Sequence, residues 1–279
     1  MTSDGPTAPG DGGAAAHTGS LPFDTSVANQ ARIYDFLLGG KDNYAVDRVA
    51  AAEMLKAYPE TELTARANRA FLGRAVRYLA AEAGIRQFLD IGTGIPTAGN
   101  THQVAQRIAP ESKVAYVDYD PVVLAHARAL LTSTGEGATE YIDADLRDTD
   151  KILTQARQLL DFDRPVAITL LTILHAITDA DQPFAIVAKL IDAVPPGSFL
   201  VITHAAIDLV DPDTMQGLQD GWKGKVQQQF QWRTRDEVAG FFAGLELVEP
   251  GLVQVDAWRP GGAGEVAKAA MWAGVAHKP

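Results

Sequence analysis

Short apolar runs alternate with longer amphipathic stretches along the middle of this chain, between residues 85 and 205. Apolar runs of about four to eight residues are typical of buried strands, whereas apolar residues that recur about every three to four positions are typical of helices. The run at 166–171 is apolar at nearly every position, as a central strand of a parallel sheet requires. The pattern predicts five strands, each followed by helical sequence, at 87–91, 113–118, 139–143, 166–171 and 198–203.

The pattern changes after residue 203. A polar stretch and a helix at 235–243 precede two β-rich runs, 245–258 and 269–276, which a glycine-rich loop separates. Strands joined by a short loop pair antiparallel. The whole pattern predicts an α/β fold, a doubly wound sheet of seven strands with a C-terminal antiparallel hairpin at its edge.

The sequence before the first strand has a helical pattern. Three helices are predicted, at 26–38, 47–58 and 61–83. They predict an N-terminal helical cap at 21–84 that packs over the mouth of a domain at 85–279. Residues 1–20 contain few groups that a fold could bury, which predicts a disordered tail.

The composition narrows the classes of function. The formal net charge is −11 and the pI is about 4.9, which oppose binding to nucleic acid or to an anionic membrane. The absence of cysteine excludes disulfides, a catalytic thiol and thiolate metal ligands. No signal peptide is recognisable, and the longest apolar run, 166–177, is too short to span a bilayer. We therefore expect a cytoplasmic protein whose main partner is a small molecule, and leave its oligomeric state open.

A glycine-rich loop, within FLDIGTGIPTAGN at 88–100, joins the first predicted strand to its helix. Glycines let the backbone take positive φ and approach a ligand closely, so the loop predicts a ligand-binding turn. Its spacing does not match the G-x-G-x-x-G pattern of dinucleotide sites. The carboxylate of Asp90 would repel a pyrophosphate at this turn but would attract the ammonium group of S-adenosylmethionine.

Two further acids follow the next two strands. Asp118 ends the second strand, where a carboxylate can accept both ribose hydroxyls of an adenosine, in NAD as well as in S-adenosylmethionine. Asp145 follows the third strand, where it could accept from the adenine amino group. Each acid could instead be solvated or cap a helix, but three acids in successive positions favour a cationic adenosine ligand.

These motifs carry a resemblance. D-x-G-x-G, V-D-x-D-P and D-A-D occur in this order, and residues 85–279 resemble class I S-adenosylmethionine-dependent methyltransferases. The sequences SVANQARIYDFLLGGKDNYAVDR and RANRAFLGRAVRYL extend the resemblance to an actinobacterial family of S-adenosyl methyltransferases, first catalogued as a domain of unknown function. The resemblance implies a Rossmann-like fold that binds S-adenosylmethionine, with no assigned acceptor.

The resemblance also implies roles for individual residues. The acids would hold the ammonium group, the ribose and the adenine amino group, and the glycine turn would let the backbone approach the aminoacyl part. Tyr119 would flank the adenine, with the backbone of Leu146 at its polar edge. The implied cofactor-binding set is Asp90, Gly92, Thr93, Gly94, Asp118, Tyr119, Asp145 and Leu146.

Two histidines are candidates for catalysis. Methyl transfer from a sulfonium needs an in-line nucleophile, and it needs a base only where the acceptor carries a proton. His175 and His204 follow the fourth and fifth strands, so both would face the cofactor, although each could be a hydrogen-bonded packing histidine. No H-x-x-x-H spacing occurs, and we expect an enzyme without a metal.

The loop LLGGKDNYAVDR is a candidate lid. Asn43, Tyr44 and Arg48 are residue types that could close over the methionine carboxylate, and Arg66 or Arg69 could supply a cation to it. The alternative is a solvated loop beside an ordinary charged helix face.

The predicted function is methyl transfer by direct displacement from S-adenosylmethionine to a small-molecule acceptor. Trp222 and Trp232 are candidates for lining an acceptor cavity, or are packing anchors. Two alternatives stay open. One is a regulatory protein that binds S-adenosylmethionine or S-adenosylhomocysteine without catalysis, and the other is a nucleotide-dependent oxidoreductase, against which Asp90 argues.

Overall fold

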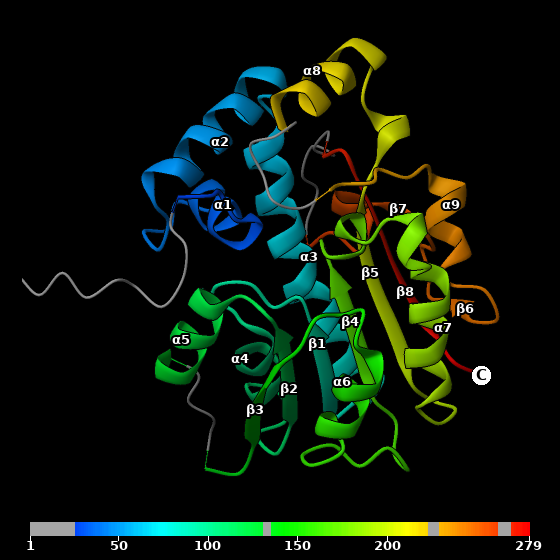
Figure 1. Ribbon diagram of the computed structural model, residues 1–279. Helices are drawn as coiled ribbons and strands as arrows, with labels where there is room; N and C mark the ends of the chain where they lie inside the picture. The colour runs from blue at the N-terminus through cyan, green and yellow to red at the C-terminus, as the bar shows by residue number, and fades with distance from the viewer. Residues whose placement is uncertain (1–25, 131–134, 223–228, 262–268) are drawn as a thin grey trace, which may run out of the picture.

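The computed structural model describes residues 26–130, 135–222, 229–261 and 269–279 (Figure 1). The predicted disordered tail at 1–20 lies outside the described residues. One sheet of eight strands organises the described part, and these strands are β1 (Gln87–Ile91), β2 (Lys113–Asp118), β3 (Ala138–Asp143), β4 (Ala167–Leu171), β5 (Phe199–Ala205), β6 (Glu246–Leu247), β7 (Val253–Gln254) and β8 (Met271–His277). The α/β class predicted from the alternating pattern is confirmed.

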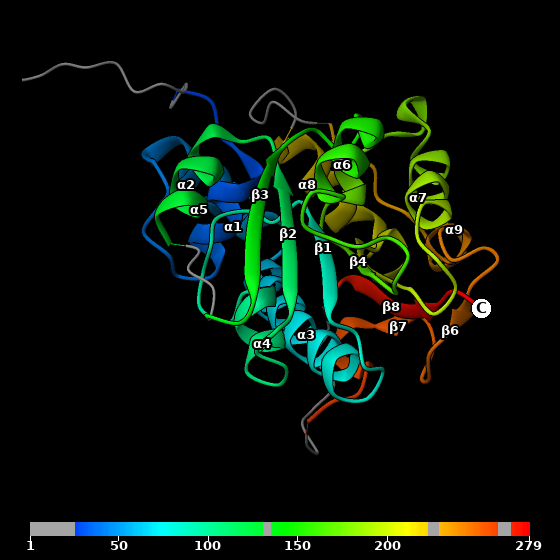
Figure 2. The ribbon, with the colours of Figure 1, turned by 90° about the horizontal axis from the view of Figure 1, so that it is seen from below.

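Helices cover the sheet and its upper end. They are α1 (Gln30–Leu37), α2 (Ala45–Ala57), α3 (Thr61–Ala81), α4 (Thr101–Gln106), α5 (Pro121–Leu130), α6 (Thr149–Ala156), α7 (Pro183–Asp192), α8 (Pro212–Trp222) and α9 (Arg235–Gly240). Figure 2 shows α3 and α4 on one face of the sheet and α6 and α7 on the other.

The strand order is β3-β2-β1-β4-β5-β8-β6, and β7 also pairs with β8. Strands β1 to β5 are parallel, with β1 between β2 and β4, so the chain changes its winding direction at β1. Open α/β sheets bind ligands outside the carboxyl ends of the strands at such a switch point. The topology therefore indicates that a ligand binds near the loop after β1.

The prediction of seven strands is wrong, because the sheet has eight. The predicted run at 245–258 forms two short strands, β6 and β7, which both pair antiparallel with β8. Pro250 has no backbone N–H to donate, and Gly251 takes a φ of 88°, so the run cannot continue as one strand. Strand β8 lies between β5 and β6, which places the C-terminal antiparallel strands partly inside the sheet.

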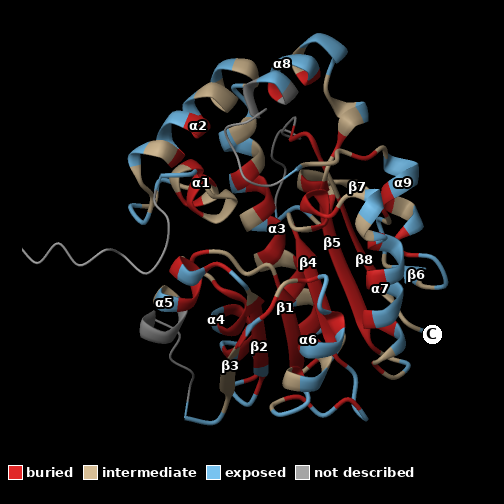
Figure 3. Cartoon of the chain, in the orientation of Figure 1, coloured by how far each residue is buried: buried red, intermediate tan, exposed pale blue. Residues whose placement is uncertain are grey.

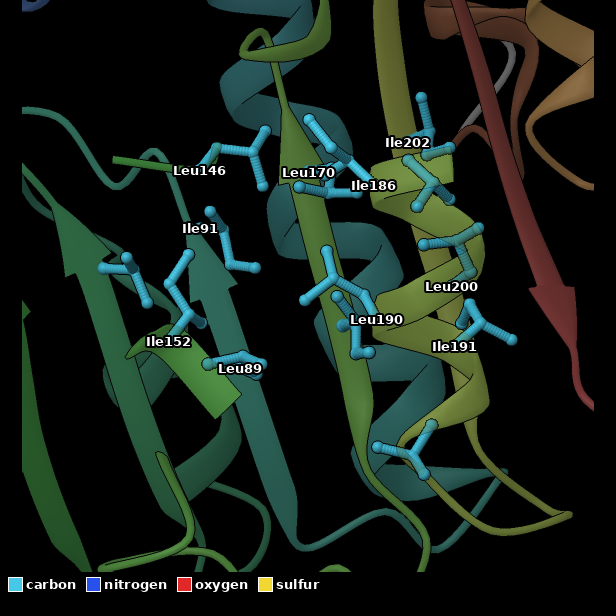
Figure 4. Packing of buried hydrophobic residues seen from close by; sticks show 14 of the residues in the cluster. Leu89, Ile91, Leu146, Ile152, Leu170, Ile186, Leu190, Ile191, Leu200 and Ile202 are labelled. Carbon is cyan, nitrogen blue, oxygen red and sulfur yellow. The ribbon is translucent and has the colours of Figure 1, made fainter. Parts of the chain in front are cut away.

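Alternating side chains of β1 enter two different cores. Leu89 and Ile91 pack with residues of β4, β5, α6 and α7 (Figure 4), whereas Phe88 packs with residues of α3 and α4. Strands β1, β2, β4, β5 and β8 are largely buried, whereas β3, β6 and β7 and the outer sides of the helices are more exposed (Figure 3). Because strand side chains alternate, Asp90 shares the face of Phe88 and points toward α4.

Helices α1, α2 and α8 gather beyond the carboxyl ends of the parallel strands (Figure 1). Helix α2 packs against both α1 and α8. A buried ion pair between Arg32 and Asp47, with 3.0 Å between Nε and Oδ2, joins α1 to α2. Helix α3 lies in the predicted cap region but packs against the sheet. The division into 21–84 and 85–279 stays a prediction.

Candidate active site

The turn after β1 needs glycine at its first position. Gly92 takes a φ of 77°, and a Cβ there would lie 2.8 Å from both Cβ and Cγ1 of Ile173. Gly94 also has positive φ, 65°, but a Cβ there would meet no atom within 4 Å. Helix α4 begins only at Thr101, since Gly99 has a φ of 78° and Asn100 is the N-cap.

Replacing Gly92 with alanine is expected to lower the free energy of unfolding by about 2 kcal/mol or more, because it adds a clash to an unfavourable φ. Gly94→Ala is the matched control, with the backbone penalty but no clash, and a loss of about 1 kcal/mol is expected. Urea denaturation of both variants measures the difference. Equal losses would contradict the close approach of Ile173.

Asp90 is buried and held by two hydroxyl groups. Thr101 Oγ1 in α4 donates to Asp90 Oδ2 at 2.6 Å, and Thr169 Oγ1 in β4 donates to Asp90 Oδ1 at 2.8 Å. Burial raises the pKa of Asp90, although both hydrogen bonds and the nearby Arg69 oppose the rise. This carboxylate lies in the wall of a cleft, where a cationic ligand group would replace some of its lost hydration.

Asp118 organises the end of β2. Its Oδ2 accepts from the backbone N–H of Gly94 at 2.9 Å, and its Oδ1 accepts from the N–H groups of Tyr119 and Asp120 at 2.8 and 3.0 Å. Burial raises the pKa of Asp118, and these hydrogen bonds lower it. The carboxylate therefore links the glycine turn to the loop after β2.

Two adjoining hollows meet at this point. The first, which we call the main cleft, lies between the glycine turn, α1 and α3, and the second, the side pocket, lies between the ends of β1, β2 and β3. Gly92, Asp118, Tyr119 and Ile173 line both. The main cleft is also lined by Asp90, Thr93, Gly94, Asn100 and Arg69, and the side pocket by Ile91, Val117, Asp145, Leu146, Arg147 and Ile177.

Arg69 of α3 is the cation that reaches the main cleft. Its Nη2 donates to Asn100 Oδ1 at 2.8 Å and to Ala98 O at 3.2 Å, and its Nε is buried without a hydrogen-bond partner in the described structure. Asn100 Oδ1 also accepts from the backbone N–H of Thr97. The polar end of the loop, residues 97–100, thus positions Arg69, a role that the sequence did not reveal.

Arg66 and Tyr44, two predicted cofactor-binding residues, lie outside the main cleft and the side pocket. Arg66 is exposed and pairs with Glu62 one turn earlier, at 2.7 Å. The backbone N–H of Tyr44 donates to the buried Asp47 at the start of α2. Neither residue lines the main cleft or the side pocket.

Two of the predicted lid residues, Asn43 and Arg48, are hydrogen-bonded to each other, and Asn43 is also bonded to Asp35. Asn43 Nδ2 donates to Asp35 Oδ2 at 2.8 Å, and Arg48 Nη1 donates to the carbonyl and side-chain oxygens of Asn43. Their role as a lid stays a prediction.

The side pocket is apolar within and charged at its rim. Leu146 is buried, while Asp145 pairs with Arg147 at 3.1 Å. Arg147 also pairs with Asp181, and this hydrogen-bonded partner is the main reason why the pKa of Arg147 is raised. The predicted adenine residues Tyr119, Asp145 and Leu146 therefore lie together.

The two candidate histidines have neighbouring rings, with 6.0 Å between their centroids, but different surroundings. His204 is fully buried, with Nδ1 2.8 Å from Ala205 O and Nε2 2.9 Å from Arg233 Nη1, and it lines none of the hollows described here. His175 lines a third, apolar pocket beside the main cleft, and its Nε2 lies 2.7 Å from Gln30 Nε2. The catalytic role of either residue stays a prediction.

Burial keeps both histidines neutral. It lowers the pKa of His175 to about 3, with His204 and Arg233 adding to the effect. It lowers the pKa of His204 to about 4, where the positive charge of Arg233 also contributes and the carbonyl of Ala205 opposes it. Each ring can therefore accept a hydrogen bond at physiological pH.

A model of a protein family described as S-adenosyl methyltransferase matches residues 16–279. The chain belongs to this family. It is an S-adenosylmethionine-dependent methyltransferase, and S-adenosylmethionine is its cofactor.

Two solved structures agree with this assignment. The methyltransferase is 44% identical to a DUF574 family protein from Streptomyces avermitilis, with a TM-score of 0.88 over 92% of this chain and 99% of that one. It is 40% identical to a protein from Thermobifida fusca, with a TM-score of 0.84 over 91% of this chain and 96% of that one. No match was found among curated proteins. The family predicted from the sequence motifs is confirmed.

No group of three or more His, Asp or Glu side chains among the described residues is placed to hold a metal ion. No helix in the described part of the chain combines the length and the apolar character needed to cross a membrane.

Proposed function

We propose that the methyltransferase binds S-adenosylmethionine across the main cleft and the side pocket, and that it transfers the methyl group to a small-molecule acceptor by direct displacement. The observation that carries the proposal is that the main cleft and the side pocket meet at Gly92 and Asp118. Asp90 and Arg69 lie at the main-cleft end, and the apolar interior of the side pocket forms the other end. This polarity matches a ligand with a zwitterionic end, a ribose and a flat base.

The main cleft offers a partner for each charge of an amino acid. Asp90 provides a carboxylate for an ammonium group, and Arg69 provides a guanidinium for a carboxylate. The unpartnered Nε of Arg69 is a buried donor, and such a group gains free energy when a ligand satisfies it. The residues of this chain therefore fit the aminoacyl end of the cofactor.

The other end fits an adenosine. Asp118 lines both hollows, so its carboxylate can accept ribose hydroxyls while it keeps the glycine turn in place. Ile91, Val117 and Ile173 supply apolar surface for the base in the side pocket. Asp145 lies at the rim of that pocket, where it can accept from an exocyclic amino group.

Bound S-adenosylmethionine would supply a methyl group on a positively charged sulfur. A nucleophile in line with the C–S bond would attack the methyl carbon, and the electrons of the broken C–S bond would stay on sulfur. His175 would hold the acceptor through a hydrogen bond to its ring. A hydroxyl proton becomes far more acidic as its oxygen gains a bond, so an imidazole of low basicity can take it late in the reaction. His204 is not placed for this role, because it lines none of the three hollows and both of its nitrogens have protein partners.

Calorimetry with S-adenosylmethionine, S-adenosylhomocysteine and NAD tests the cofactor assignment. We expect both sulfur ligands to bind and NAD to bind more weakly, because Asp90 would repel its pyrophosphate. Absence of binding by either sulfur ligand would refute the proposed site. A non-catalytic binding protein is the alternative, and transfer of labelled methyl from the cofactor to molecules of a metabolite extract separates it from an enzyme.

Arg69→Ala is expected to weaken binding of S-adenosylmethionine about 10-fold, since a charge-assisted hydrogen bond to the ligand contributes roughly 1.5 kcal/mol or more. Arg66→Ala is the matched control on the same helix, and an affinity within about twofold of wild type is expected, because Arg66 lies on the exposed side with Glu62. Calorimetric titration measures both affinities. A larger loss for Arg66 than for Arg69 would reverse the assignment.

A further inference from the structure

A third hollow, which we call the apolar pocket, adjoins the main cleft. Gln30, Tyr34 and Thr172 line both, so a molecule in the apolar pocket would lie next to one in the main cleft. Helices α1, α2 and α3, which gather above the sheet in Figure 1, supply most of its wall. The remaining lining residues are Ile33, Leu37, Met54, Thr61, Thr64, Ala65, His175, Ala205, Phe230, Trp232 and Met271.

We propose that the apolar pocket is the acceptor subsite and that it binds an uncharged aromatic molecule through one hydroxyl group. This inference rests on the proposed function, because it places the acceptor beside the cofactor cleft. It adds the chemical class of the acceptor and the residues that select it.

The described lining disfavours a charged acceptor. Among the described residues that line the pocket there is no Asp, Glu, Lys or Arg. An ion moved from water to such a pocket loses its hydration and finds no opposite charge. The described lining therefore favours an uncharged group on the part of the acceptor that enters the pocket.

Aromatic side chains favour a flat ring system. The Phe230 ring lies 5.3 Å from the His175 ring at an interplanar angle of 34°, and Tyr34 and Trp232 line the same space. Offset and tilted ring contacts of this kind favour an aromatic ligand beyond the area it buries. Trp232 lines this pocket, and its predicted role at an acceptor cavity stays a prediction, whereas the side chain of Trp222 lies outside the described residues.

Gln30 and His175 form the polar end of the pocket. Gln30 Nε2 donates to Thr172 O at 2.9 Å and lies 2.7 Å from His175 Nε2. The contact with a carbonyl oxygen fixes the orientation of the Gln30 amide, because the reverse orientation would bring two oxygens together. His175 Nε2 is therefore the acceptor, and its proton is assigned to Nδ1.

This arrangement selects a hydrogen-bond donor. The single lone pair of His175 Nε2 accepts one hydrogen bond, which a hydroxyl of the acceptor can make in place of Gln30. An ether or a ketone has no proton to offer. Thr172, whose carbonyl holds Gln30, has a φ of 53°, an unfavourable conformation for threonine of the kind that clusters at ligand sites.

Thr64 adds a second polar atom. Its Oγ1 is buried, belongs to a residue that lines the pocket, and has no hydrogen-bond partner in the described structure. His175 Nδ1 is likewise buried and unpartnered there. Buried groups without partners are unusual in native proteins, and a bound ligand is one way in which they become satisfied.

The test uses 2-naphthol as probe on the full chain saturated with S-adenosylhomocysteine, with calorimetry as the readout. We expect 2-naphthol to bind at least 10-fold more tightly than 2-methoxynaphthalene, which lacks the donor, and than naphthalene-2-sulfonate, which is charged. Phe230→Ala and Trp232→Ala should each weaken 2-naphthol binding about 10-fold without changing the affinity for S-adenosylhomocysteine. Phe184→Ala, at an aromatic residue outside the pocket lining, is the control and should leave both unchanged.

Gln30→Leu tests whether the Gln30–His175 pair selects an acceptor with a hydrogen-bond donor or serves only the structure of the pocket. Removing the competing amide should tighten 2-naphthol binding several-fold and leave 2-methoxynaphthalene unchanged. If S-adenosylhomocysteine binds but 2-naphthol does not, or if the pocket variants do not affect 2-naphthol, the acceptor subsite is refuted and the proposed function stands. If S-adenosylhomocysteine does not bind at all, the proposed function fails, and the subsite fails with it.

Discussion

Asp118→Ala is expected to weaken binding of S-adenosylmethionine about 100-fold. Hydrogen bonds from ligand hydroxyls to an ionised carboxylate contribute roughly 1.5–3 kcal/mol each, and a ribose offers two. A loss of about 3 kcal/mol corresponds to a factor of about 100 in affinity. The carboxylate also holds the backbone N–H groups of Gly94, Tyr119 and Asp120, so its removal loosens both loops that would enclose the ribose.

Calorimetric titration with S-adenosylhomocysteine measures this effect, and urea denaturation of the same variant shows how much of it comes from folding. Asp145→Ala is the matched control, since Asp145 already pairs with Arg147 at the rim of the side pocket. Its loss should lower the affinity by less than 10-fold, because that ion pair is partly exposed to solvent. An unchanged affinity of Asp118→Ala would overturn the ribose assignment.

Acidification from pH 6.5 to pH 4 is expected to lower the free energy of unfolding by about 3 kcal/mol for each of the two buried histidines. The pKa of His175 is lowered to about 3 and that of His204 to about 4 in the folded protein. Below pH 6.5 the unfolded chain binds a proton at each histidine while the folded protein does not. Stability is therefore lost as the pH falls, by about 1.4 kcal/mol per pH unit for each group.

Urea denaturation at several pH values, compared between variants, measures this contribution. His175→Gln and His204→Gln should each have a shallower dependence on pH between 6 and 4 than wild type. The comparison between variants matters because Asp90 acts in the opposite direction, since burial raises its pKa. Equal slopes for wild type and both buried-histidine variants would contradict the prediction.

The three acids show how far local sequence patterns can be read. Asp90, Asp118 and Asp145 lie at or just after the carboxyl ends of three successive predicted strands, and the ends of parallel strands lie on the same side of a sheet. The structure places all three in the walls of the two adjoining hollows. Strand periodicity is local, and parallel topology follows from the alternation with helices, so this part needed no tertiary information.

Arg66 and Arg69 of α3 show what local sequence patterns cannot predict. Arg66 and Arg69 differ by three positions, so both lie near the same side of the helix. Helical spacing alone cannot say which of them reaches the cleft. Arg69 is the arginine that reaches the cleft, because it donates a hydrogen bond to Asn100, which is 31 residues away in sequence.

The glycine turn, the order of the strands and helices, and the family were determined by the sequence, because they depend on residue types at short spacing. The tertiary structure decided the strand pairing at the C-terminus, the position of Arg69 in the main cleft, the apolar pocket, and the access of His175 rather than His204 to that pocket. Each of these depends on side chains that are distant in sequence, such as Gln30 and His175, and only packing brings them within hydrogen-bond distance.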